Sequence, residues 1–396
     1  MNKKTTASDN VRLFVFIAFL LFAFCVLKVL RGSDTSSNAT GGIWNYISLL
    51  YYPLTIFALI RTTHTLKAVF VTSLLYIITA LITAIFNFNG ALDINTVYNF
   101  LMIPYFWLVF VSFYCYADHN KLGYNIIVFA FFVCLLLNLM TIIKYQFGGA
   151  ERPLASDIYY SLGLFPFVLV MTKNKRIKTV AVLGMFFAVF FSNKRTGIIA
   201  FIIAYVVFKL VSEKVSNANN FLNALKTVLI IAVILLAFYY VGRYFDNKFA
   251  LGIFERLERL QDDGGSGRDK IYAAIWQEYK DSGFAEKIFG HGMYATNALT
   301  GFNAHNDFLE VLYDYGVFAF IFIICFYLSL IRHCVNMVKQ ASPYAAAFSA
   351  SIVIGLFLSM FSFMLVYFTY VTPIVAFWGY SLSMEKHRLI KFETTE

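Results

Sequence analysis

Apolar runs of roughly 17 to 24 residues recur from one end of the chain to the other, separated by short polar segments. Each run has about the length, roughly 20 residues, that an α-helix needs to cross the hydrocarbon core of a bilayer. Helices satisfy their own backbone hydrogen bonds, as that core requires. The pattern predicts an all-α, polytopic membrane protein with about twelve transmembrane helices. The predicted spans are 12–30, 43–60, 66–86, 97–117, 122–145, 158–172, 177–193, 196–211, 222–241, 311–331, 344–364 and 367–384.

One polar segment is long enough to hold a folded unit. We therefore divide the chain into residues 1–241 with transmembrane helices 1 to 9, residues 242–310 as one large external (periplasmic) loop domain, and residues 311–396 with helices 10 to 12 and a cytoplasmic tail. A unit of about 70 residues rarely has enough core to fold alone. We expect it to pack against the membrane helices.

The Lys and Arg residues predict the orientation. More than half of the 32 basic residues fall in segments that share one side of the membrane when the N-terminus is placed inside. Short cytoplasmic loops carry this excess in membrane proteins. Both termini are therefore predicted to be cytoplasmic. The first apolar run follows Lys3 and Lys4 and lacks a small-residue cleavage site before Arg31, so it is expected to stay as an anchor.

Composition narrows the class of partner. Apolar residues make up 60% of the chain and charged residues 14%, and the formal net charge is +10. The positive charge lies mainly in the predicted cytoplasmic segments, where it contacts anionic lipid, and no basic patch with interleaved aromatics indicates nucleic acid. None of the five cysteines lies in the external segment, so no structural disulfide is expected.

The polar segment has its own helical pattern. Ser266 can cap a helix that begins near Gly267 or Arg268, with Ile271, Ala274, Ile275 and Tyr279 on one face, and 282–283 ends it. Residues 288–292 (IFGHG) are typical of a short apolar element followed by a glycine turn. Asn306 or Asp307 is expected to start the next helix, which places His305 directly before it.

Two basic residues occupy an unusual place. Lys194 and Arg195 lie in a short reversal between two apolar runs, on the side opposite to that favoured by the orientation rule. Charged residues inside a membrane protein commonly face a water-filled interior and mark a binding site. The alternative is that both side chains extend to the lipid headgroups.

Arg268 and His305 are the other candidates. Arg268 opens the predicted helix, where a guanidinium suits phosphate oxygens; a solvated arginine or an ion pair with Asp262 or Asp263 is the alternative. A neutral His305 can accept a proton from a hydroxyl, and nearby arginines would lower its pKa. A structural hydrogen-bonding role is its alternative.

Other chemistries lack a specific motif. The chain contains no GxSxG, HExxH, Walker loop or CxxC sequence. His305 and Asp307 form a weak metal-binding pair with no third ligand at a fixed spacing. The first predicted external loop contains Asp34 as its one acidic residue and so offers no paired carboxylates. We expect no metal and no cofactor.

The order of these parts resembles the O-antigen ligase and O-antigen polymerase family of bacterial inner-membrane glycosyltransferases. That family has about twelve spans, an external SxxRT-like turn midway, and a large external loop with an SGR sequence, an aromatic residue, a GxG turn and HNxxL before the next span. This chain has SNKRT at 192–196, SGR at 266–268, Trp276, GHG at 290–292, and HNDFLEVLYDYGV at 305–317.

The resemblance implies a metal-independent glycosyl transfer from an undecaprenyl-pyrophosphate-linked oligosaccharide to an acceptor glycan. By that resemblance Arg195 and Arg268 bind the pyrophosphate, Lys194 shares it, and His305 activates or orients the acceptor hydroxyl. A chain-length regulator and a flippase are the partner proteins it implies, and the bacterial inner membrane the location. His291 departs from the neutral middle residue that the GxG turn usually has.

The resemblance does not identify the acceptor glycan. We favour polymerisation of repeat units into surface polysaccharide (O-antigen or capsule), because Arg152, Arg243 and Lys248 supply further external cations for a second lipid diphosphate. An O-antigen ligase that transfers the glycan to lipid A-core is the alternative. A polysaccharide transporter or flippase should show paired, Pro- or Gly-broken spans, and no such pairing is visible.

Overall fold

The computed structural model describes residues 3–31, 47–61, 67–88, 94–147, 156–192, 194–216, 264–362 and 368–393, with 229, 236, 239, 240, 243 and 244. Secondary structure in these ranges is helical. The helices are α1 (Lys3–Arg31), α3 (Tyr51–Arg61), α4 (Lys67–Phe86), α5 (Ile94–Met102), α6 (Tyr105–Tyr116), α7 (Lys121–Phe147), α8 (Ile158–Met171), α9 (Lys175–Phe191), α10 (Arg195–Val215), α13 (Gly264–Asp281), α14 (Phe284–Phe289), α15 (Ala295–Thr300), α16 (Asp307–Lys339), α17 (Ala345–Phe361) and α18 (Phe368–Glu393).

Four of the described helical segments are long and apolar enough to cross a membrane: Asn10–Leu30, Ala68–Phe86, Lys121–Lys144 and Asp307–Lys339. The helices α5 and α6 form a fifth candidate, bent by 43° at the break before Tyr105. Shorter apolar helices lie at Ile47–Leu59, Ile158–Met171 and Ala345–Phe361. The chain is therefore a polytopic helical membrane protein, as predicted. The ninth predicted span, 222–241, lies almost wholly outside the described residues.

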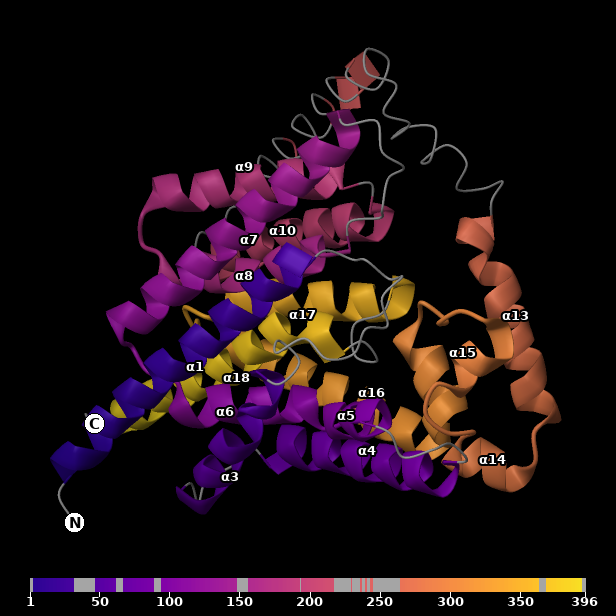
Figure 1. The fold of residues 1–396 in the computed structure, drawn as a ribbon. Helices are drawn as coiled ribbons and strands as arrows, with labels where there is room; N and C mark the ends of the chain where they lie inside the picture. The colour runs from indigo at the N-terminus through magenta and orange to yellow at the C-terminus, as the bar shows by residue number, and fades with distance from the viewer. Residues whose placement is uncertain are drawn as a thin grey trace.

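The helices pack in pairs around one continuous core. α18 packs against α6, α17 against α10, α16 against α4, and α1 against α7 (Figure 1). Large aromatic side chains fill the interior; Trp378, Tyr380 and Phe167 are among those that are almost completely buried. Aromatic rings supply large buried areas with few rotatable bonds, so they define the packing of the bundle.

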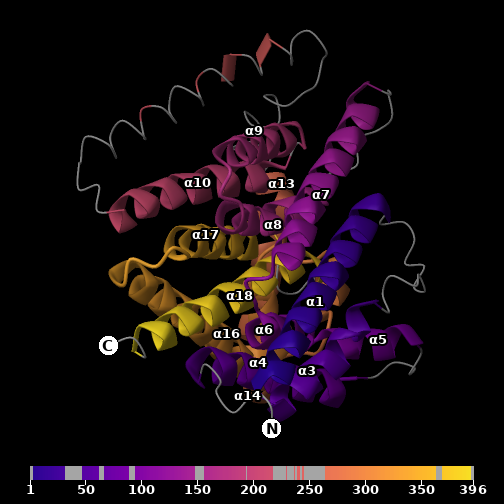
Figure 2. The same ribbon diagram turned by 90° about the vertical axis from the view of Figure 1, so that its left-hand side faces the viewer.

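The two ends of the bundle differ. The start of α1 and the end of α18 lie at one end, and α13, α14 and α15 gather at the other (Figure 1). Turned by 90°, the same bundle shows both termini on the side that faces the viewer (Figure 2). The polar helices and the termini are therefore separated by the length of the bundle.

A kink in α16 anchors the polar helices to the bundle. Gly316 has φ +81° and ψ 179°, which interrupts the helical hydrogen bonding. The carbonyls of Tyr313 and Asp314 accept instead from the backbone N–H groups of His291 (3.1 Å) and Gly292 (2.9 Å). Buried carbonyls need such partners. The glycine turn after α14 therefore takes the place of one missing turn of helix.

His291, which departs from the family pattern, has a packing role here. Its ring stacks on Tyr313 with 4.1 Å between ring centroids and 15° between planes. Its Nε2 lies 2.9 Å from the hydroxyl of Ser282, and its Nδ1 lies 3.1 Å from the carbonyl of Tyr313. These contacts hold the end of α13 against α16.

The polar side chains of Thr83, on α4, and Asn87, directly after it, complete the attachment. The Thr83 hydroxyl donates to the carbonyl of Phe289, and the Asn87 amide donates to that of Gly290 at 3.3 Å. The described part of the polar segment thus packs directly on the membrane helices through α4 and α16.

The geometry of the turn after α14 predicts that position 290 requires glycine. A Cβ atom at Gly290, whose φ is +78°, would lie 2.3 Å from the carbonyl oxygen of Asp314. Gly301 has a similar φ of +74°, but a Cβ there meets nothing within 4 Å. We expect Gly290→Ala to lower the thermal unfolding temperature in detergent well below that of Gly301→Ala, which bears only the backbone penalty of about 1 kcal/mol. Equal unfolding temperatures would contradict this docking geometry.

Candidate active site

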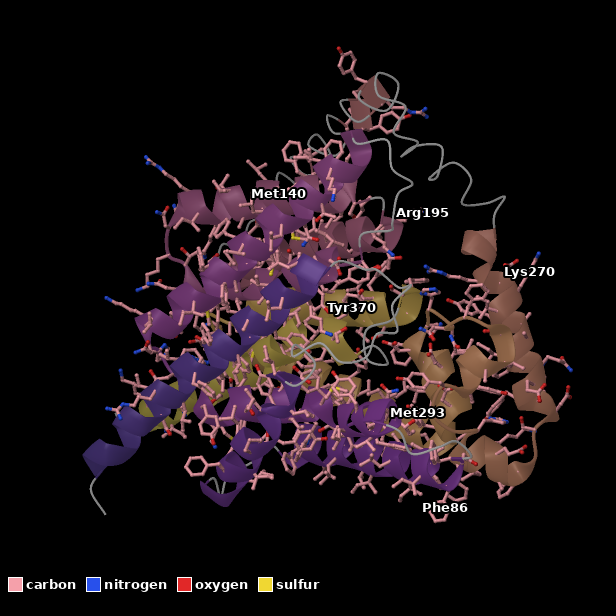
Figure 3. All side chains as sticks on the ribbon, in the orientation of Figure 1. Phe86, Met140, Arg195, Lys270, Met293 and Tyr370 are labelled. Atoms are coloured by element: carbon pink, nitrogen blue, oxygen red, sulfur yellow. The ribbon has the colours of Figure 1, made fainter. Side chains whose placement is uncertain are left out.

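The turn between α9 and α10 presents two of the predicted site residues. α9 ends at Phe191 and α10 begins at Arg195, with Ser192 and Lys194 between them in the described chain. The Ser192 hydroxyl accepts from the backbone N–H of Lys194 at 3.3 Å, which tightens the reversal. Lys194 and Arg195 are both half-buried. In Figure 3, Arg195 lies at the end of the bundle that faces α13.

The end of α17 brings α10 and α13 together. The last carbonyls of a helix lack partners within it. The Phe361 carbonyl accepts from the Thr196 hydroxyl at 3.2 Å and from Nη1 of Arg268 at 2.5 Å. The next residue, Ser362, exchanges a hydrogen bond of 3.1 Å with the hydroxyl of Tyr159 on α8. Four distant segments therefore meet at one point.

Arg268 follows a glycine in an unusual conformation. Gly267 has φ +76°, a backbone region that favours glycine. α13 begins at Gly264, earlier than the predicted start near Gly267, and ends at Asp281 as predicted. On the face predicted from helical spacing, Ile275 is buried, and Ile271 and Tyr279 pack beside it. Ala274, assigned to the same face, is exposed.

His305 lies at the start of α16 in a strained conformation. Its φ is +55°, which is uncommon for a residue other than glycine. Asn306 caps the helix as predicted, because its side chain accepts from the N–H groups of Phe308 and Leu309, both at 3.1 Å. Strained residues persist where their surroundings hold them, and they cluster at functional sites.

Two side chains hold the backbone on either side of His305. Glu310 Oε2 accepts from the backbone N–H of Ala304 at 3.1 Å, in buried surroundings. The Tyr272 hydroxyl donates to the carbonyl of His305 at 3.4 Å. Ala304 also packs with Ile275 and Tyr313 in a small separate core. The loop is therefore fixed between α13 and α16.

The electrostatic environment keeps His305 neutral. Burial, together with the positive charges of Arg268 and Lys194, lowers the pKa of His305 from 6.5 to about 4. The imidazole is uncharged at neutral pH and can accept a hydrogen bond. Arg268 and Lys194, from separate elements, thus both act on this one ring.

A buried carboxyl group, that of Asp157, also lies near Lys194. Asp157 directly precedes α8 and is 6% exposed. Burial raises the pKa of Asp157 to about 7, although the charges of Lys194 and Lys28 act in the opposite direction. The charge on Asp157 therefore changes near neutral pH, next to a candidate phosphate-binding residue.

The sequence placed Lys194, Arg195, Arg268 and His305 near one another, and the structure brings them to the same end of the bundle. It adds Thr196, Tyr272, Glu310 and Ser362, which sequence reasoning missed. Thr196 and Glu310 stand inside the quoted motifs, at the ends of SNKRT and of HNDFLE. Thr196 and Ser362 bond to residues of distant segments, Phe361 and Tyr159, which a single sequence does not reveal. Within the described ranges, no three His, Cys, Asp or Glu side chains form a group suited to a metal ion.

Glu310 offers a test of how His305 is held. Glu310→Ala should leave the buried Ala304 N–H without an acceptor, a loss of roughly 1–3 kcal/mol. Glu310→Gln keeps an oxygen that can accept that bond. We expect faster amide hydrogen exchange over residues 303–306 in the alanine variant and near-normal exchange in the glutamine variant. Unchanged exchange in Glu310→Ala would show that the contact does not fix the loop.

The comparisons with known proteins cover this part of the chain. The Wzy_C family model, described as O-antigen ligase, matches residues 180–324. No curated protein matches the chain. The matched region contains Lys194, Arg195, Arg268 and His305, and it runs from α9 into the membrane part of α16. Residues 180–324 are therefore similar to the Wzy_C family, described as O-antigen ligase.

Proposed function

We propose that this protein polymerises undecaprenyl-pyrophosphate-linked oligosaccharide repeat units into surface polysaccharide, as a metal-independent glycosyltransferase. The family carries out transfer of lipid-linked glycans, which supports the reaction class. The observation that carries the proposal is the placement of two cations, Arg268 on α13 and Lys194 before α10, close enough to the half-buried imidazole of His305 to lower its pKa. Arg195 adds a third cation beside Lys194.

The reaction needs these groups at one place. The acceptor hydroxyl attacks the anomeric carbon of the donor sugar, the bond from that carbon to the phosphate oxygen breaks, and the pyrophosphate leaves with the electron pair. Arg195, Arg268 and Lys194 meet the charge that develops on the leaving group. Fixed donors in a shielded site stabilise such charge strongly. His305 accepts the hydroxyl proton on an imidazole nitrogen.

Donor binding should change the basicity of His305. The positive charges of Arg268 and Lys194 are among the causes that hold the His305 pKa near 4. A bound pyrophosphate would offset both charges, so the pKa of His305 should rise toward its ordinary value in the complex. The substrate thereby improves the base that acts on its own acceptor.

The membrane placement is part of the proposal. We place the protein in the bacterial inner membrane with both termini cytoplasmic and residues 242–310 as a periplasmic loop domain. The separation of the termini from α13–α15 along the bundle supports this arrangement. The proposed site then faces the outer leaflet, at the side that α13–α15 occupy.

Substitutions test the assigned roles. Arg268→Ala, Arg195→Ala and His305→Ala should each lower polymer synthesis by about 100-fold or more, because each removes charge stabilisation or the proton acceptor. Lys270→Ala is the matched control, since Lys270 lies two residues beyond Arg268 and is exposed. Polymer is measured by gel electrophoresis in a complemented deletion strain, with membrane insertion checked by immunoblot. Full-length polymer from His305→Ala would remove the proposed base.

The pH dependence tests the change in basicity. Neutral His305 is the active form, so rates should fall as the pH drops through its pKa. The acid limb of kcat/KM, which reports the free enzyme, should lie near pH 4, and the acid limb of kcat, which reports the complex, should lie at higher pH. Both are measured with purified protein and lipid-linked substrate. A kcat limb at the same pH or lower would contradict donor-assisted activation.

The ligase alternative uses the same site with a different acceptor, and the description of the matched family favours it. Glycan length in a deletion strain separates the two. Single repeat units attached to the lipid A-core indicate a polymerase, whereas accumulated long lipid-linked polymer indicates a ligase.

A further inference from the structure

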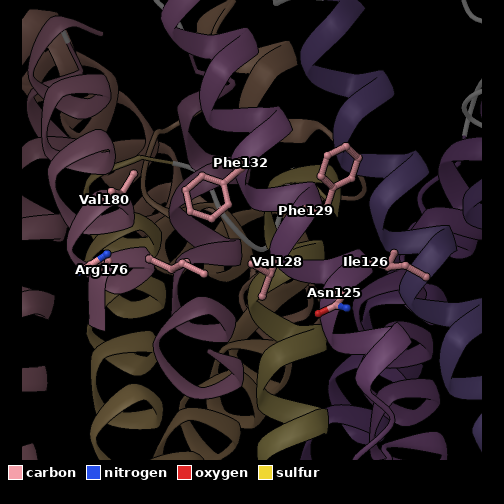
Figure 4. A pocket seen from close by; sticks show the side chains of 8 residues that line it. Asn125, Ile126, Val128, Phe129, Phe132, Arg176 and Val180 are labelled. Carbon is pink, nitrogen blue, oxygen red and sulfur yellow. The ribbon is translucent and has the colours of Figure 1, made fainter. Parts of the chain in front are cut away.

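An apolar groove lies on the outside of the bundle between α7 and α9. Its volume is about 690 Å³, and its walls combine Phe129, Phe132 and Val128 of α7 with Ile177 and Val180 of α9 (Figure 4). Phe129 and Val180 are 60% and 57% exposed, so the groove is open along its side. The lining residues recur at helical spacing, which makes the groove run along the two helices.

Positive charge is concentrated at the end of this groove. Lys173, Lys175 and Arg176 are exposed, Lys178 is half-buried, and Arg176 itself lines the groove. The first turn of α9 has no acidic residue. Within the ranges that the structure describes, none of these four cations forms an ion pair. Lys209 of α10 adds a further positive charge near Lys178.

The positive charge at this groove comes from side chains and not from the backbone N–H of Arg176. The side chain of Asn174 already accepts from the N–H of Arg176 at 2.9 Å, so this backbone donor of α9 has a partner. An occupant must therefore combine an apolar tail that fits the groove with an anionic head that meets Lys175 and Arg176. Basic sites between membrane helices recognise anionic lipid head groups in this way.

The groove is separate from the proposed active site. Arg176 is near the start of α9, whereas Lys194 and Arg195 follow its end. A helix of 17 residues is about 25 Å long. The lipid donor that reacts at His305 therefore does not place its diphosphate at Arg176.

We propose that this groove binds an anionic phospholipid, with an acyl chain between α7 and α9 and the phosphate head on Lys175 and Arg176. A second groove gives a comparison within the same chain. It has about 520 Å³ and is lined by Leu328, Ser329 and Arg332, among others. The lining of that groove contains one arginine, together with His333 and Asn336.

Native mass spectrometry of the full chain, purified from equal mixtures of phosphatidylglycerol and phosphatidylcholine, tests the proposal. We expect retained lipid to be mainly phosphatidylglycerol. Lys175→Ala and Arg176→Ala should each lower that preference about fivefold, the contribution expected of one cation near an anionic surface. Arg332→Ala is the matched control and should leave the preference unchanged.

A third variant separates the groove from surface charge. Val180→Trp fills the groove and keeps every cation, so it should remove the tightly held lipid. Equal retention of the two lipids by the unmodified chain would overturn the proposal. So would an unchanged preference in the Lys175→Ala/Arg176→Ala double variant, or normal lipid retention by Val180→Trp.

Discussion

The arrangement of the candidate site depends on the exposed carbonyl at the end of α17. Phe361 accepts hydrogen bonds from Thr196 and Arg268, and Ser362 bonds to Tyr159. These residues come from four elements that are separated by up to about 200 positions along the chain. The last carbonyls of a helix have no partners within it, and here hydrogen-bond donors come from α10 and α13, which bear the candidate cations Arg195 and Arg268.

The second constraint is the kink at Gly316. It divides α16 into a membrane part and two outer turns that carry Glu310, Tyr313 and Asp314. The carbonyls released at the kink bind the glycine turn, while Glu310 reaches back to the loop of His305. One helix thus positions the polar segment and the imidazole together. The contacts that hold His305 in the left-handed backbone region also hold the fold. This explains how so uncommon a conformation persists for a histidine.

Much of this architecture could be predicted from the sequence because membrane spans follow a strong physical rule. Runs of about 20 apolar residues, caps such as Asn306 and the break at 282–283 are local signals. The cap and the break matched the structure, and four of the predicted spans matched described helices that are long and apolar enough to cross a membrane. The predicted start of α13 was less accurate: the helix begins at Gly264 and includes Gly267, whose φ is positive. The candidate site residues were proposed from charge in unexpected places and from short motifs.

The supporting groups could not be predicted in that way. Tyr272 and Glu310 bond to backbone atoms of the loop before α16, and Ser362 bonds to the Tyr159 hydroxyl. A bond to a backbone group does not depend on which residue supplies that group, so the sequence does not reveal it. The role of Asp157 could not be predicted either, because its burial depends on how α8 packs against α7, α17 and α18. Tertiary contacts of this kind become visible once the helices are placed in space.

The contacts around Phe361 also bear on how the protein is made. Since α17 follows α10 and α13 in the chain, the anchor for Arg268 is synthesised after every cation that it helps to arrange. During translation the earlier helices must enter the membrane while these guanidinium and ammonium groups still lack their final neighbours. Assembly of the site is therefore a late event in biogenesis, and a truncated product that ends before α17 would retain the cations without the geometry that aligns them.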